Sequence, residues 1–257
     1  MGDGDVSASL VDAETRVHAR LITRQAGVLA GRDWAQAAFE LLDADCHLTW
    51  SAADGDQIQP EQTLCTIKGR ARALLSAERT ALNFLQLLSG VATRTRQYVE
   101  AVAGTGVRLL DTRKTIPGLR QAQKYAVTCG GGHNHRLGLF DMVMLKENHI
   151  AAAGGIGAAV AHARRLHPDL SIEVEVESLA QLNQAIDARA DRIMLDNFSL
   201  DLMREAVRIN AGRSVLEASG GLGLDQIRQV AETGVDEISV GALTKAIEPL
   251  DLSLLFG

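Results

Sequence analysis

The sequence predicts an α/β protein with a mixed first part and a parallel, barrel-like second part. After Val107, short β-rich runs alternate with helical segments, which is typical of βα units built around a parallel sheet. Several of these runs end in a polar or charged residue, as strands do at the face of a barrel that carries the active site. Six such units are visible rather than eight, so an incomplete or open barrel is expected.

The first ninety or so residues are expected to hold short strands followed by one long helix. Strand-like alternation occurs at 17–31, 46–52 and 63–69, and the segment 53–62 has the Asp-Gly and proline chemistry of turns. From Arg70 the apolar residues recur at helical spacing, and the pair Ser89-Gly90 is expected to kink or break this helix. The apolar positions are Leu74, Ala81, Leu85, Leu88 and Ala92.

Polar side chains end the predicted parallel strands. A single charged residue after a strand could simply lie in a solvent-exposed loop. Here both signs of charge occur at successive strand ends, which favours a functional site on one face of the sheet. The runs are 107–112, 141–149, 171–178, 192–197, 214–221 and 236–243. The polar residues are Asp111, Lys146, Glu175, Asp196, Glu217 and Ser219.

Composition excludes several classes of protein. Hydrophobic residues make up 46% of the 257 residues, enough for a sizeable core, and the net charge of −6 argues against bulk binding of nucleic acid. Three scattered cysteines, Cys46, Cys65 and Cys129, and an acidic N-terminus without an apolar segment predict a reducing, cytoplasmic location. The small-residue run 151–161 is too short to span a membrane.

Glycine-rich turns follow the last two predicted strands, at 217–223 (EASGGLG) and 239–247 (SVGALTKAI). Glycine allows backbone N–H groups to approach a phosphate closely, and barrels often bind phosphate after their last strands. Either turn alone could be an ordinary βα connection. Together, in the last two positions, they favour a phosphate site.

Charged residues of both signs are expected around the same face. The cations Arg113, Lys114, Arg136 and Lys146 lie among Thr, Gly, His and Asn rather than on an exposed charged helix, and would suit a substrate with several negative charges. Glu175 and Asp196 end successive strands, and carboxylates that face phosphates need a cation such as Mg²⁺ between them. The alternating stretch 173–177 (EVEVE) could equally be a strand with one polar face.

The segment CGGGHNHR, residues 129–136, combines potential metal ligands with potential anion donors. Cys129, His133 and His135 could suggest zinc, but a structural zinc site needs ligand pairs from two places, and no second Cys/His pair is present. We therefore favour a close approach of the glycine backbone, with His135 and Arg136 as donors to an anion.

The segment 109–150, LLDTRKTIPGLRQAQKYAVTCGGGHNHRLGLFDMVMLKENHI, closely resembles the core of the quinolinate phosphoribosyltransferase family. The resemblance covers nearly the whole chain and includes GDGDVS, AGVLAG, SAERTALNFLQLLSGVAT, IEVEVES, IMLDNF, LEASGG and ETGVDEISVGALT. It implies phosphoribosyl transfer from phosphoribosyl pyrophosphate to quinolinate with Mg²⁺, which yields nicotinate mononucleotide, pyrophosphate and carbon dioxide for NAD synthesis. The implied fold is an N-terminal α/β sandwich and an open parallel α/β barrel.

The resemblance also implies an arrangement of domains and subunits. Residues 1–92 would form the sandwich, 93–245 the barrel, and the tail 246–257 would return to the first domain. Family members are dimers or multiples of dimers, and each site is completed by the neighbouring subunit. Arg79 would then reach the site in trans.

Roles for individual residues follow from the same resemblance. Quinolinate would be bound by Arg79, Arg113, Lys114, His135, Arg136 and Lys146. Glu175 and Asp196 would face the ribose and the Mg²⁺ ion, directly or through water, and would share catalysis with Lys114 and Lys146. The 5-phosphate of phosphoribosyl pyrophosphate would lie against Ser219, Gly220, Gly221, Gly241 and Ala242.

Two departures from the family pattern are visible. Members usually carry a few helical turns before GDGDVS, whereas this chain begins almost at that motif, so a truncated and a naturally short member both fit. Thr128 stands where arginine is common in the family, and the missing positive charge would weaken the local positive electrostatic potential.

Three other functions remain open on the sequence. A molybdenum-operon paralogue of the same fold would act on a different substrate, but HNHR and LKENH are both intact here. A barrel aldolase would use Lys146 to form a Schiff base, which requires a lysine of lowered pKa. A non-catalytic metabolite-binding subunit would have no need of both acids and all the cations.

Overall fold

The computed structural model describes residues 4–257, and the chain divides into two compact units. Residues 1–3, which include the start of the GDGDVS motif, lie outside the described residues. The first unit runs to Arg96 and also contains Tyr125–Gly131 and Ala246–Gly257; the second contains Gln97–Lys124 and Gly132–Lys245. Compared with the expected ranges 1–92 and 93–245, the division falls after Arg96, and the short segment Tyr125–Gly131 groups with the first unit.

The first unit is an antiparallel sheet with helices packed against it. Its four strands have the order β12-β1-β5-β3, and a separate two-stranded ladder joins β2 to β4. Apolar residues of α1, α2, β1 and β5 form one buried core. The elements are η1 (Ala8–Leu10), β1 (Arg16–Thr23), β2 (Gly27–Val28), α1 (Arg32–Glu40), β3 (His47–Trp50), β4 (Gln57–Ile58), β5 (Thr63–Arg70), α2 (Ala71–Ala101) and β12 (Leu252–Phe256).

The expected break at Ser89-Gly90 is wrong, because α2 is continuous from Ala71 to Ala101. Both residues serve tertiary contacts instead. The Ser89 hydroxyl is buried and accepts a hydrogen bond from the Ala30 N–H at 3.0 Å. Gly90 gives room to the backbone at Glu248, which passes where a side chain at position 90 would lie. Small residues in this helix therefore mark a close approach of chain segments rather than a kink.

The second unit is an open parallel barrel. Its six strands have the order β6-β11-β10-β9-β8-β7, and every neighbouring pair is parallel. The first strand, β6, pairs with the last, β11, as in a closed barrel, but in the described residues no ladder joins β6 to β7. The strands are β6 (Arg108–Leu110), β7 (Val143–Leu145), β8 (Ile172–Val176), β9 (Arg192–Asp196), β10 (Val215–Ser219) and β11 (Glu237–Ser239). All six expected runs thus contain a strand.

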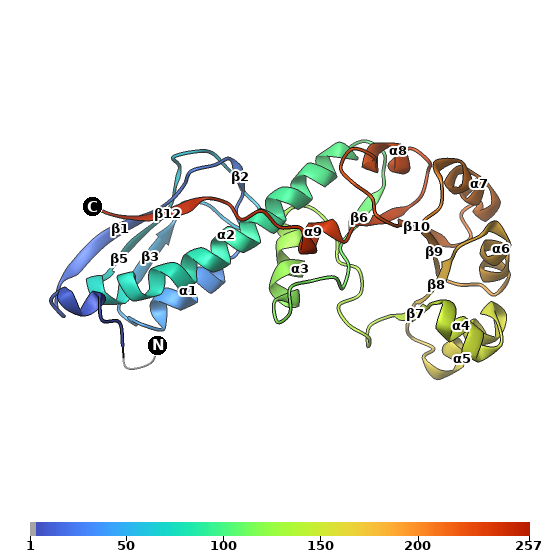
Figure 1. Cartoon of the computed structure of the whole chain (residues 1–257), viewed down its shortest axis with the longest axis horizontal. Coiled ribbons are helices and arrows are strands. Elements are labelled where there is room, and N and C mark those ends of the chain that lie inside the picture. The colour runs from blue at the N-terminus through green and yellow to red at the C-terminus, as the bar shows by residue number, and fades with distance from the viewer. Residues whose placement is uncertain (1–3) are drawn as a thin grey trace. The chain divides into compact units, whose positions relative to one another are not determined.

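Helices cover the outer face of this sheet, as Figure 1 shows for α5 to α8. In β8 the outward residues Ile172, Val174 and Val176 are fully buried, which explains the alternation of the sequence there. The glutamates between them point into the barrel. The helices are α3 (Arg120–Cys129), α4 (Glu147–Ala153), α5 (Ile156–Leu166), α6 (Leu179–Asp187), α7 (Leu200–Asn210), α8 (Ile227–Ala231) and α9 (Ala242–Lys245).

The segment that carries HNHR lies beside β6, next to the opening between β6 and β7. His133 forms a parallel bridge with Leu110: its N–H donates to the Leu109 carbonyl at 2.8 Å, and its carbonyl accepts from the Asp111 N–H at 3.0 Å. The extended loop that contains His133 therefore lies beside β6, on the side where the described residues form no ladder to β7. The residues that follow it, His135 and Arg136, line the cavity of the barrel. Across the described part of the chain, no helix is long and apolar enough to cross a membrane.

Candidate active site

A cavity of about 340 Å³ opens within the barrel unit, at the carboxyl ends of the strands. This is the end at which parallel barrels place their active sites. Residues from every strand except β6, and from the loops after β6 and before β7, contribute to it. Its lining is Thr112, Arg113, Lys114, His135, Arg136, Met144, Lys146, Glu175, Met194, Asp196, Glu217, Ser219 and Ser239.

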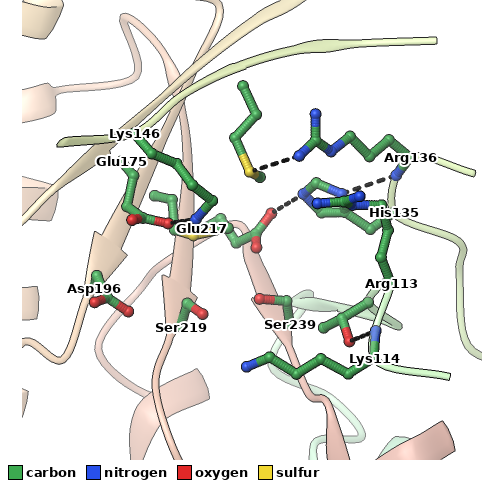
Figure 2. Close-up of a pocket in the computed structure, with 13 residues that line it drawn as sticks. Arg113, Lys114, His135, Arg136, Lys146, Glu175, Asp196, Glu217, Ser219 and Ser239 are labelled. Carbon is green, nitrogen blue, oxygen red and sulfur yellow. Dashed lines mark hydrogen bonds and ion pairs between the residues drawn. The ribbon is translucent and has the colours of Figure 1, made fainter. Parts of the chain in front are cut away.

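Three cations enter the cavity from one side, all from loops rather than strands. In Figure 2, Arg113 and Arg136 lie on this side, whereas the Lys114 side chain extends beneath Ser239 toward Ser219. Among the described residues, the Arg136 guanidinium contacts only the Met142 carbonyl and the Met144 sulfur, each at 3.4 Å. Burial and the neighbouring Arg113 both lower the pKa of Arg136. An anion placed here would relieve that repulsion and pair with guanidinium groups that lack a carboxylate.

The opposite side carries two carboxylates and one lysine (Figure 2). Lys146 forms an ion pair with Glu175, and Asp196 follows on the next strand. Burial, and then the nearby Glu175 charge, raise the pKa of Asp196. The charges of Lys146 and Lys114 oppose this shift without cancelling it, so the negative charge here would suit a cation or a positively charged reacting group.

Glu217 and Ser239 form the buried floor between the two sides. Both line the cavity, and the side chain of Glu217 is fully buried. Its Oε2 lies 3.2 Å from His135 Nε2, and the Ser239 hydroxyl helps to lower the pKa of Glu217. Both side chains face a cavity that a polar ligand could fill.

Below the floor, the barrel interior contains an ion network instead of the branched apolar residues usual in barrels. Arg192 is the centre of this network. Its guanidinium lies 3.1 Å from Glu217, forms an ion pair with Glu237, and reaches Glu173 at 3.5 Å. Arg108 pairs with the other oxygen of Glu237. The glutamates are at most 1% exposed, so their charges depend on these partners.

A second buried pair lies behind the HNHR segment. Lys124 and Asp111 form an ion pair, and both side chains are at most 1% exposed. Asp111 also accepts the His135 N–H at 2.9 Å, and Lys124 donates to the His135 carbonyl at 3.0 Å. Burial raises the pKa of Asp111 to about 6, although Lys124 opposes the shift.

The raised pKa of Asp111 predicts a pH-dependent stability. A folded-state pKa above the unfolded value of 3.8 stabilises the fold below pH 3.8, and this contribution is lost as the pH rises through 6. We expect Asp111 to remove about 3 kcal/mol from the free energy of unfolding across this window. Urea unfolding between pH 3.5 and 7 measures it, and the Asp111→Asn variant should lack this part of the slope. An identical slope in both proteins would contradict the assignment.

The cavity gathers most of the residues that the sequence singled out. Arg113, Lys114, His135, Arg136, Lys146, Glu175, Asp196 and Ser219 line it. Arg79, Gly220, Gly221, Gly241 and Ala242 do not, although a side chain at position 241 would lie 3.1 Å from the Lys114 side chain. Glu217 was expected at this face as a strand-end residue but was given no role, and Asp111 of the same set is instead buried against Lys124. Sequence reasoning did not assign Thr112, Met144, Met194 or Ser239 to the site.

Within the described residues, one group has the side chains and spacing to hold a metal ion: His135, Glu173 and Glu217. His133 and Cys129 are not part of it. The Arg192 guanidinium already contacts both carboxylates, so a cation occupies the place where a metal would neutralise them. We assign no metal to this group.

Comparison with known proteins decides the family. Residues 5–89 match the N-terminal domain of quinolinate phosphoribosyl transferase, and residues 91–255 match its C-terminal domain. The chain belongs to the quinolinate phosphoribosyl transferase family. It is 40% identical over 255 residues to a probable carboxylating nicotinate-nucleotide pyrophosphorylase of Bacillus subtilis, covering 99% of this chain and 88% of the relative.

Two further members of the family are similarly close. The carboxylating nicotinate-nucleotide pyrophosphorylase of Mycobacterium leprae is 44% identical over 249 residues, which cover 95% of this chain and 88% of that protein. The solved nicotinate-nucleotide pyrophosphorylase from Francisella tularensis is 47% identical with a TM-score of 0.98, covering 100% of this chain and 91% of that one. Family and fold therefore agree along the whole chain.

Proposed function

We infer that this protein is a carboxylating nicotinate-nucleotide pyrophosphorylase. It transfers the phosphoribosyl group of phosphoribosyl pyrophosphate to quinolinate, and releases pyrophosphate and carbon dioxide as nicotinate mononucleotide forms. The observation that carries this inference is the cavity itself, where unpaired cations face a carboxylate pair across a buried floor. The two carboxylates of quinolinate can pair with the cations. The positive charge that develops on the ribose during transfer can be stabilised by the carboxylate pair.

The cation side would bind and orient quinolinate. Arg113 and Arg136 supply planar donors for its carboxylates, and Lys114 supplies a third positive charge. The pyridine nitrogen is the nucleophile, so no side chain has to attack. Once the nitrogen carries the ribose, its positive charge stabilises the electron pair that carbon dioxide leaves behind on the neighbouring ring carbon, and a proton from water then takes the place of the carboxylate. The protein contributes mainly orientation and the exclusion of water.

The acid side would face the ribose, the pyrophosphate and Mg²⁺. Glu175 and Asp196 offer the hard oxygen donors that Mg²⁺ prefers, and the raised pKa of Asp196 reflects negative charge with too little compensation. When bound, Mg²⁺ would neutralise the pyrophosphate as it leaves. Lys146 forms an ion pair with Glu175 and would lie close to the reacting groups.

The 5-phosphate would be bound after the last two strands. Ser219 lines the cavity at the end of β10, and Gly220 follows with φ +123°, a conformation that favours glycine. Gly241 follows β11 beside Lys114, where any side chain would be crowded. These two turns supply backbone N–H groups without obstructing side chains, in the position where barrels commonly bind phosphate.

Substrate choice tests the proposal. The purified protein is incubated with phosphoribosyl pyrophosphate, Mg²⁺ and either quinolinate or nicotinate, and nicotinate mononucleotide is measured by chromatography. We expect quinolinate to react far faster, because two carboxylates match the cations better than one. Equal rates with both acids, or no product from either, would contradict the proposed function.

Metal removal should separate catalysis from folding. If Glu175 and Asp196 bind Mg²⁺ together with pyrophosphate, EDTA should abolish turnover while circular dichroism stays unchanged, and added Mg²⁺ should restore the rate. A structural metal would instead be lost together with the fold. Stoichiometric zinc found by elemental analysis of the purified protein would reverse this assignment.

We propose that Arg79 completes the site of a partner subunit. Arg79 is exposed on α2 of the first unit and does not line the cavity of the barrel unit. A symmetric dimer would carry two equivalent sites, each built from both chains. Arg79→Ala and Lys114→Ala are each expected to be nearly inactive. When both are unfolded and refolded together, about half of the dimers would be mixed, and about a quarter of wild-type activity should return.

The complementation experiment has a direct control. Each variant refolded alone should remain inactive, and mass spectrometry of a tagged pair should confirm that mixed dimers have formed. If Arg79 serves the site of its own chain, every site in a mixed dimer keeps one lesion. Confirmed mixed dimers without recovered activity would therefore refute the trans assignment.

A further inference from the structure

We propose that Glu173 and Glu217 are positioning residues for quinolinate, which act through the His135 ring on the backbone at Arg136. The inference rests on the proposed function and adds to it a part of the barrel interior that lies behind the binding residues. The buried carboxylates, the imidazole and the Arg136 N–H form one continuous chain of hydrogen bonds and ion pairs.

His135 is anchored at every polar atom it has. Its ring Nε2 lies 3.0 Å from Glu173 and 3.2 Å from Glu217, and its ring Nδ1 accepts the Arg136 N–H at 2.8 Å. Its own N–H and carbonyl bind the buried pair of Asp111 and Lys124. Neither ring nitrogen is free for a ligand in this arrangement. The side chain therefore serves to fix an irregular loop at the point where Arg136 enters the cavity.

Arg136 needs such an anchor because its own side chain has few partners. Among the described residues its guanidinium makes two contacts, both 3.4 Å long and neither to a carboxylate. Burial and the nearby Arg113 lower the pKa of Arg136, and the charges of Glu173 and Asp141 oppose this only in part. Without substrate, a long arginine under these conditions would gain from turning toward solvent. A fixed backbone at Arg136 limits this turning of the side chain and keeps the guanidinium in the orientation that binds an anion.

The protonation of His135 is consistent with a donor role toward the two carboxylates. Burial alone would lower the pKa of His135, but the hydrogen bonds to Glu173 and Glu217 outweigh burial and raise it. Nε2 therefore carries a proton and faces these carboxylates as a donor. The Arg136 N–H points at Nδ1, where a second ring proton would face another donor, so the geometry favours the ring with its single proton on Nε2.

The carboxylates are themselves held by cations. Arg192 contacts both Glu173 and Glu217, and its other partner, Glu237, lies on β11. Apolar residues would fill the same space at a lower cost of desolvation, as they do in most barrels. The ion network thus has a physical role that an apolar core would lack: it gives the His135 ring one fixed orientation.

Glu173 offers the cleanest test, because it contacts His135 but does not line the cavity. Glu173→Gln keeps the size of the side chain and removes its charge. We expect KM for quinolinate to rise about 10-fold, the usual scale for residues that orient a binding residue from behind, while KM for phosphoribosyl pyrophosphate stays within about twofold. A purely structural lesion would not separate the two substrates in this way.

Glu205→Gln is the matched control. Glu205 lies on α7 of the same unit and pairs with Arg208 three residues later, outside the ion network of the barrel interior. It should leave KM for quinolinate within about twofold of wild type. Glu173→Asp keeps the charge and withdraws the carboxylate from Nε2, and it replaces the glutamine variant if that variant does not fold.

Three results would overturn the inference while leaving the proposed function intact. They are an unchanged KM for quinolinate in the Glu173 variants, an equal rise of KM for both substrates, and a rise in Glu205→Gln that matches Glu173→Gln. An inactive wild-type protein would instead contradict the proposed function, so the two failures are distinguishable. A selective rise in the Glu173 variants alone supports the positioning role.

Discussion

Arg136→Ala is expected to lower kcat/KM for quinolinate by about 30-fold to 5,000-fold, which corresponds to about 2–5 kcal/mol for a desolvated carboxylate left without its partner. Arg136 faces the cavity without a carboxylate of its own, so its positive charge is available to the substrate. The loss should appear in both binding and rate, because a misplaced pyridine ring also misaligns its nitrogen. Steady-state kinetics with quinolinate varied at saturating phosphoribosyl pyrophosphate measure the effect.

Arg204→Ala provides the control for this prediction. Arg204 belongs to the same unit but lies on the exposed helix α7, where it pairs with Asp201 three residues earlier. Its removal should change kcat/KM by less than about twofold, as is usual for surface substitutions. An Arg136→Ala protein that retains wild-type kinetics would show that quinolinate does not depend on this side of the cavity.

Asp196→Asn is expected to lower kcat by about 100-fold or more, the scale seen when one charge-stabilising group is removed from a transition state. The same change should leave the fold as stable or make it more stable. Burial and Glu175 raise the pKa of Asp196, so its ionised form opposes folding at neutral pH, and a neutral amide removes that cost. Kinetics and urea unfolding on the same preparation test both parts.

Asp201→Asn is the matched control for Asp196→Asn. Asp201 is 94% exposed at the start of α7, where its charge has little effect on the cavity. Both its activity and its unfolding midpoint should stay close to wild type. An Asp196→Asn variant that loses stability together with activity would mean that the carboxylate holds the fold and that its role in catalysis is indirect.

The alternation of apolar and polar residues predicted the barrel well. Each expected run contains a strand, and residues at strand ends, such as Lys146 and Asp196, do meet in one cavity. Strand ends are predictable because their position depends on local pattern and on the geometry of parallel sheets.

The same sequence patterns could not predict tertiary contacts. Glycine at position 90 looked like a helix break because the sequence cannot show that the backbone at Glu248 passes beside it. The alternating stretch 173–177 was compatible with a strand that has one polar face. In the structure Glu173 is fully buried and faces the Arg192 guanidinium, nineteen residues later in the sequence. Partners so distant in sequence become visible only when the barrel brings their strands side by side.

The central claim is that quinolinate loses one carboxylate as it gains the phosphoribosyl group, and carbon dioxide release measures this most directly. Quinolinate labelled with ¹⁴C in its 2-carboxylate is incubated with the protein and Mg²⁺, with and without phosphoribosyl pyrophosphate. The account predicts labelled carbon dioxide only when phosphoribosyl pyrophosphate is present, in equal amount to the pyrophosphate formed. Release without phosphoribosyl pyrophosphate, or pyrophosphate formed without release, would contradict it.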